Sequence, residues 1–198
     1  VFYELELSSE SVYVQSQLLL TRRLVYADGV QLFGGQLEKP ELPGAQVVEL
    51  GEGKSSVVQR DGRSYGSFEQ RYAIFPEQSG VLTIPSDSVT ASVRVLDGIS
   101  TSRKTVRVST DEKRITVKPI PSEYPADKPW LPAIAVTAAQ RFEPPLISDF
   151  EVGDTVTRTV NVRVIGNSGA SLPPVHLALP EDQFKTYPQP TEISDDAM

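Results

Sequence analysis

Apolar and polar side chains alternate along most of the chain, most clearly through residues 68–85 (FEQRYAIFPEQSGVLTIP). Side chains two positions apart point to the same face of a strand, so Phe68–Phe75 presents two faces. Pro76 cannot donate a backbone hydrogen bond, and Gln78–Gly80 then offers a turn that tolerates positive φ. Val81–Ile84 resumes the alternation. The pattern predicts a two-stranded β-ribbon around which the rest of the chain packs.

A second long strand is predicted upstream, where Leu18, Leu20, Arg22, Leu24 and Tyr26 share one face. Because two consecutive arginines occupy this strand, one of them must be accommodated on the inward side or near the strand edge. Asp-Gly pairs, which favour hairpin turns, follow at three places. They are Asp28-Gly29, Asp61-Gly62 and Asp97-Gly98, and the Asp61-Gly62 pair is the clearest hairpin signal.

The remaining alternating segments give an all-β prediction, with glycine and proline at the breaks and no helical period. Residues 34–44 are predicted to form a loop, because their prolines do not suit a central strand. The other strands expected in the first part of the chain are Phe2–Leu7, Val12–Ala27 (with a kink), Val47–Leu50, Val57–Arg60, Ser64–Phe75, Val89–Leu96, Thr105–Ser109 and Arg114–Lys118.

A proline-rich stretch, PIPSEYPADKPWLP at residues 119–132, lacks alternation and predicts a stiff extended linker. We therefore expect a first module over 1–120, a linker over 121–132 and a second module over 133–198. The strands expected in the second module are Ala133–Arg141, Asp154–Ile165, Val175–Leu179 and Phe184–Tyr187.

A weak internal repeat relates the two modules, since Leu18, Leu24 and Tyr26 align with Val156, Val162 and Val164. The repeat favours tandem immunoglobulin-like antiparallel β-sandwich modules, the second incomplete at its C-terminus.

Charge and composition narrow the classes of partner. The chain has 19 Lys and Arg against 26 Asp and Glu, a formal net charge of −7, so nucleic acid and anionic membrane surfaces are not expected partners. It has no cysteine, which excludes disulfides, thiol catalysis and cysteine metal sites. No signal peptide or membrane span is predicted. Because strand-like sequence begins at Val1 and a domain-like pattern runs to Met198, we expect a fragment of a longer protein.

Candidate chemistry is sparse. His176 is the only histidine, and one imidazole without cysteine partners builds neither a closed zinc site nor a triad by itself. The acidic pairs are Asp111-Glu112, Glu181-Asp182 and Asp195-Asp196. They lie in turn-like sequence, so solvated turns are expected; calcium at a module junction is the alternative, although the loop of an EF-hand is absent.

Two aromatic residues of the linker, Tyr124 and Trp130, have two interpretations. They wedge between the modules and set their angle, or they stack on a sugar or peptide. Gly34-Gly35 lacks the strand and helix that a phosphate loop needs. The sequence thus predicts no catalytic, cofactor-binding or metal-binding residue and no cofactor.

Several segments together resemble one bacterial family. They are Ser8–Ala27, Glu41–Pro43, Gln70–Ser86, Ile115–Pro125, Trp130–Ala133, Val152–Gly166 and Leu172–Pro174. In this order they resemble the BatD family, the oxygen-tolerance or aerotolerance proteins, over nearly the whole chain. The resemblance implies tandem immunoglobulin-like modules on the periplasmic or extracytoplasmic face of the inner membrane, anchored by a helix absent from this sequence. It also implies von Willebrand factor A-type envelope proteins as partners and no catalytic residues.

The leading hypothesis is therefore a non-catalytic protein–protein interaction module of the cell envelope. It binds through exposed strand edges, or through a carboxylate that completes the metal shell of a von Willebrand factor A-type partner. The alternative is a carbohydrate- or peptidoglycan-binding module that uses Trp130 and Tyr124. An enzyme is the third and last hypothesis. It ranks last because no neighbouring groups that would tune an active site accompany the acidic pairs in the sequence.

Overall fold

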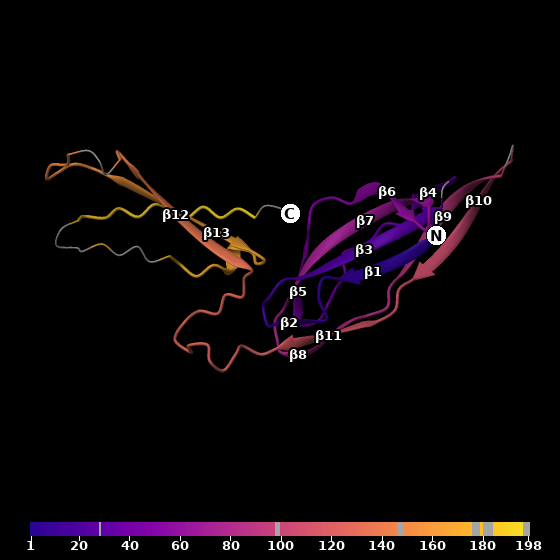
Figure 1. Ribbon diagram of the computed structural model, residues 1–198, viewed down its shortest axis with the longest axis horizontal. Coiled ribbons are helices and arrows are strands. Elements are labelled where there is room, and N and C mark those ends of the chain that lie inside the picture. The colour runs from indigo at the N-terminus through magenta and orange to yellow at the C-terminus, as the bar shows by residue number, and fades with distance from the viewer. Residues whose placement is uncertain (28, 98–99, 146–148, 176–178, 180–183, 196–198) are drawn as a thin grey trace. The chain divides into compact units, whose positions relative to one another are not determined.

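A computed structural model describes the chain except residues 28, 98–99, 146–148, 176–178, 180–183 and 196–198 (Figure 1). The described chain is all-β, with several mainly antiparallel sheets and no closed barrel. It divides into two compact units, Val1–Ala126 and Asp127–Asp196. Among the described residues, no helix has both the length and the apolar character to cross a membrane. The all-β prediction is confirmed.

The first layer of the N-terminal unit is a five-stranded antiparallel sheet in the order β1-β3-β7-β5, and β6 also pairs with β7. Its strands are β1 (Phe2–Leu7), β3 (Leu18–Ala27), β5 (Ala45–Glu49), β6 (Lys54–Arg60) and β7 (Arg63–Pro76). The inward face of β3 buries Leu18, Leu20, Arg22 and Leu24, as the alternation predicts.

The opposite layer consists of two three-stranded sheets, β10-β9-β4 and β2-β11-β8. Their strands are β2 (Ser11–Tyr13), β4 (Val30–Gly34), β8 (Gly80–Ile84), β9 (Ser88–Asp97), β10 (Ser100–Ser109) and β11 (Lys113–Lys118). Because β8 pairs with β11 and β9 with β10, these four strands form one long antiparallel ribbon interrupted in the middle. Strand β2 adds to β11 in parallel.

Two apolar clusters fill the space between the layers. In the larger, Leu18, Leu20 and Ile74 of the first sheet pack with Ile84 and Ile115 of the sheet β2-β11-β8. The smaller cluster joins the first sheet to β9 through Tyr3, Leu24 and Val89. Each fully buried aliphatic side chain contributes about 1.5–3 kcal/mol, so these clusters are the main attraction between the layers.

The predicted ribbon over 68–85 is wrong. Strand β7 belongs to the first sheet and β8 to the opposite layer, so the turn after Pro76 crosses between layers instead of closing a hairpin. At the crossing, the Pro76 carbonyl accepts from the Gln15 N–H (2.7 Å) and the Glu77 N–H donates to Gly44 (2.8 Å). Placing β8 opposite β7 lets the inward residues of both strands bury each other, which a flat ribbon does not allow.

The hairpin predicted at Asp61-Gly62 is confirmed. It joins β6 and β7 in a register that pairs Arg60 with Arg63. Asp61 has φ 48° and Gly62 φ 72°, the two positive φ values that a type I′ turn requires.

The described residues of the C-terminal unit form one two-stranded sheet, β12 (Ala135–Glu143) with β13 (Thr157–Ile165), and a short 3₁₀ helix, η1 (Gly169–Ser171). These strands confirm two predicted segments. The strand predicted at Phe184–Tyr187 is wrong: the segment pairs with no described strand, and both aromatic side chains are exposed. The segment predicted at Val175–Leu179 lies mostly outside the described residues.

Replacing Ile115 by Ala will test how strongly the sheet β2-β11-β8 packs on the first layer. Ile115 is 1% exposed, so the cavity left behind costs about 2–4 kcal/mol of unfolding free energy. The neighbouring Thr116 is exposed, and Thr116→Ala is the matched control, expected to change stability by less than about 0.5 kcal/mol. Urea denaturation measures both; equal effects would contradict the packing described.

Candidate functional site

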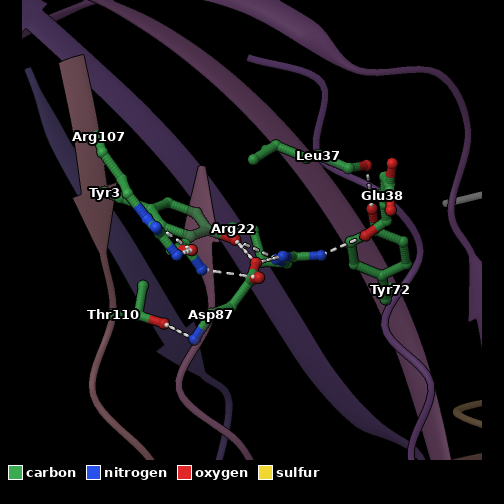
Figure 2. Close-up of polar contacts among 9 residues, drawn as sticks. Tyr3, Arg22, Leu37, Glu38, Tyr72, Asp87, Arg107 and Thr110 are labelled. Carbon is green, nitrogen blue, oxygen red and sulfur yellow. Dashed lines mark hydrogen bonds and ion pairs between the residues drawn. The ribbon is translucent and has the colours of Figure 1, made fainter. Parts of the chain in front are cut away.

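The inward face of β3 carries a buried charge, Arg22, between the apolar residues Leu20 and Leu24. Figure 2 shows Arg22 with its polar neighbours. Only 4% of Arg22 is exposed. Its guanidinium donates from Nε to the Tyr3 hydroxyl and from Nη1 to the Glu38 carbonyl. Its Nη2 forms an ion pair with Asp87 Oδ2. Arg22 thus connects β1, β3, the loop after β4 and the segment between β8 and β9.

Two tyrosines complete this cluster. The Tyr3 hydroxyl accepts from Arg22 and donates to Asp87 Oδ2 (2.6 Å), while the Tyr72 hydroxyl donates to the Leu37 carbonyl (3.0 Å). The guanidinium carbon of Arg22 lies 5.6 Å from the Tyr3 ring centroid and 5.9 Å from that of Tyr72, within cation–π range. With these two rings nearby, only 5% of the Arg22 side chain is exposed.

Burial raises the pKa of both phenols above the usual 10.0, and the nearby positive charge of Arg22 offsets part of the rise. Both hydroxyls are therefore protonated at neutral pH, and Tyr3 serves as a donor to Asp87 rather than as a base. The hydroxyls of Tyr3 and Tyr72 and all three kinds of guanidinium nitrogen of Arg22 already have protein partners. The arrangement suits a structural role.

Asp87 also forms hydrogen bonds across the interruption of the long ribbon. Its backbone N–H donates to Thr110 Oγ1 (3.2 Å), and its carbonyl accepts from the Thr110 N–H (2.8 Å). Its Oδ1 accepts from the Ser88 N–H (2.8 Å). The sequence indicated that one of the two arginines is inward, but it gave no signal for Asp87 or Tyr3 as partners.

The other arginine, Arg23, points outward into an acidic stripe. Arg23 Nη2 lies 2.7 Å from Glu69 Oε2, and Arg23 Nη1 lies 3.9 Å from Glu4 and 3.7 Å from Glu6. Glu4 also accepts two hydrogen bonds from Arg60. The Arg60 hydrogen bonds, more than the attraction of the positive charges, lower the pKa of Glu4 below its usual 4.5.

Those candidate residues that the structure describes do not come together into a reactive site. His176, Glu181-Asp182 and Asp196 lie outside the described residues. Asp111 and Glu112 are exposed in the irregular connection between β10 and β11, where Glu112 pairs with Arg114 (2.8 Å). Asp195 accepts from the Ser168 hydroxyl (2.9 Å) and the Gly169 N–H (2.7 Å). In the described part of the chain, no three acidic or imidazole side chains are placed to hold a metal ion.

Tyr124 and Trp130 are each half-buried in the irregular stretch before β12. Neither side chain is a fully exposed platform for a sugar. Gly34 ends β4 and Gly35 follows it, both with positive φ (73° and 79°). They lead into a loop and not into a helix, so no phosphate loop is formed there.

One hollow lies beside the start of β4, with a volume of about 410 Å³. The side chains around it come from β3, β4, β6 and β7 and include Tyr26, Val30, Val57 and Tyr65. Val57 is 70% exposed, and the hollow is open to solvent. Its lining is apolar and hydroxylic, so it suits an apolar side chain better than a reacting substrate.

Comparison of the chain with protein-family models, with curated proteins and with solved structures finds no match. The resemblance to the BatD family stays a prediction, and function has to be argued from the surfaces of the molecule.

Removing the buried charge will destabilise the N-terminal unit strongly. Arg22→Met keeps the volume but leaves the Glu38 carbonyl and the Tyr3 hydroxyl without their donor, and should cost about 3–5 kcal/mol. Asp87 is 39% exposed, so Asp87→Asn should cost only about 1–2 kcal/mol. Chemical denaturation of both variants and the double variant measures the coupling; additive losses would contradict a direct pair.

Glu4 makes stability depend on acid pH. A carboxyl with a lowered folded-state pKa stabilises the fold above its unfolded pKa, and this contribution is lost as pH falls through the folded-state pKa. We expect Glu4→Gln to be less stable than the parent at pH 7 and to lose less stability between pH 7 and pH values below its usual 4.5. Thermal unfolding across pH measures this, and parallel curves would refute it.

Proposed function

We propose that this chain is a non-catalytic protein–protein interaction module of the bacterial cell envelope, at the periplasmic or extracytoplasmic face of the inner membrane. Its complex is of the aerotolerance type, as the resemblance to the BatD family implies, with von Willebrand factor A-type proteins as partners. Each nitrogen of the Arg22 guanidinium has a protein partner, and this supports a non-catalytic role, because the most buried charge of the described chain serves the fold.

The order of the strands supports an immunoglobulin-like module for the N-terminal unit. Counting β1, β3, β4, β5 and β7 as A to E, the first layer has the order A-B-E-D. The long ribbon supplies F (β8 and β9) and G (β10 and β11), with β4 as C beside F. We extend the proposal to the C-terminal unit as an incomplete second module, on the weaker support of one strand pair.

The observation that carries the proposal is the unpaired outer edge of β8. In the described structure, β8 bonds to β11 on one side and ends its sheet on the other. The strand, GVLTI, contains no lysine, proline or bulge that would block pairing, and Val81 is 69% exposed. Such an edge accepts an added strand from a partner, with main-chain hydrogen bonds for affinity.

A second contact route uses a carboxylate. Asp61 occupies the tip of the β6–β7 hairpin, exposed and held at positive φ by the turn. A protruding Asp can supply an oxygen ligand to a hard divalent cation held by a von Willebrand factor A-type partner. No specific observation favours the glycan-binding alternative, since Tyr124 and Trp130 are partly covered.

An immobilised von Willebrand factor A-type domain from the same envelope complex will test both routes by pull-down. We expect retention of the parent chain, with about a tenfold loss in Val81→Lys/Thr83→Lys, because edge lysines oppose strand addition. Thr116→Lys, on the same sheet but on a paired inner strand, is the matched control. Asp61→Asn should weaken retention only when magnesium is present.

Indifference to chelator would remove the carboxylate route and leave edge pairing. Retention that none of these variants changes would remove both routes, and no retention at all would overturn the proposed partner class.

A further inference from the structure

The outward face of the sheet β10-β9-β4 is basic although the chain as a whole is acidic. Strand alternation places Arg94 of β9 and Arg103 and Arg107 of β10 on this face, all three exposed, together with Phe33 of the edge strand β4. We call these four residues the arginine face. Arg107 donates to the Ser88 hydroxyl, whereas Arg94 and Arg103 form no ion pair with any carboxylate that the structure describes.

The arrangement of Arg94 and Arg103 is unfavourable in the absence of an anion. The two residues are direct cross-strand partners, and like charges placed opposite each other destabilise a sheet. Both guanidinium groups nevertheless converge on one ring: their central carbons lie 5.2 Å and 5.7 Å from the Phe33 centroid. The ring offsets part of the repulsion through cation–π attraction. It also holds two forked donors beside each other, where one carboxylate could accept hydrogen bonds from both.

In the described part of the chain, no strand pairs with the edge next to this face. Strand β4 pairs with β9 on one side and ends its sheet on the other, and its sequence, VQLFG, has no lysine or proline. The hollow lined by Val30 and Val57 begins at the same edge. An extended segment laid along β4 would therefore meet main-chain groups, an apolar hollow and the two arginines.

We propose that the arginine face and the β4 edge together bind an extended acidic segment of a partner protein, with Asp or Glu at alternating positions. This inference rests on the proposed role as an interaction module and adds a second surface and the chemistry of its partner. A uniformly charged polyanion fits less well, because a few arginines neutralise only a short stretch of it while the net charge of −7 repels the remainder.

Fluorescence anisotropy with a synthetic labelled peptide of alternating Glu and Thr tests the inference on the full chain. We expect saturable binding that weakens with salt, and about tenfold weaker binding in Arg94→Gln/Arg103→Gln, as expected for two exposed ion pairs. Lys113→Gln/Arg114→Gln on β11 removes the same charge elsewhere and should bind like the parent. Both variants change exposed residues, so unfolding midpoints should stay within about 2 °C of the parent.

Three results would overturn the inference. They are equal binding of a Gln-Thr peptide, binding that the Arg94/Arg103 substitutions leave unchanged, and no saturable binding up to about 1 mM peptide. Arginine-dependent binding to phosphatidylglycerol vesicles in preference to the peptide would assign the face to an anionic membrane instead. A negative result with the peptide would not contradict the proposed contacts of the β8 edge and Asp61 with a von Willebrand factor A-type domain. Those contacts are tested by variants on other strands.

Discussion

The N-terminal unit depends on one buried positive charge. Moving a guanidinium out of water costs several kcal/mol, and this cost is recovered only if its donors are bonded. Arg22 meets this condition with a carboxylate, a hydroxyl and a backbone carbonyl, each from a different segment of the chain. Since those segments belong to both layers and to the loop after β4, the arginine requires all of them to be in place together.

The position of this charge explains why the core has two parts. Leu20 belongs to one apolar cluster and Leu24 to the other, and Arg22 lies between them on the same strand face. The ribbon of the opposite layer is interrupted at the same level, between β8 and β9 and between β10 and β11. Asp87 and Thr110 bond to each other across that interruption, so the break supplies the carboxylate that the arginine needs.

The sequence was sufficient to predict those features that depend only on local backbone geometry. The Asp61-Gly62 turn needs two positive φ values and closes a hairpin wherever strands flank it, so sequence was sufficient. The Pro76 region was misread because a proline followed by a glycine-containing turn ends a strand equally well in a hairpin and in a crossing between layers. Which occurs depends on where β8 finds its partner, and that partner, β11, lies some thirty residues further along the chain.

The candidate sites show the same limit of prediction from local sequence. Alternation placed one of the two arginines inward, but Asp87 is 65 residues from Arg22 and nothing in its neighbourhood marks it as a partner. The arginine face depends on the register of β10 on β9, which sets Arg103 opposite Arg94. A shift of one residue would send one of them to the other side of the sheet, so periodicity alone does not reveal the pair.

The parallel pairing of β2 with β11 has a mechanical consequence. Ser11–Tyr13 and Thr116–Lys118 run in the same direction, so tension applied through the chain before β2 and after β11 pulls the two strands along their axes in opposite senses. Their hydrogen bonds are then loaded in shear and must rupture together, whereas antiparallel strands pulled from one end separate one bond at a time. A module of this construction resists stretching better than its modest pairing length suggests.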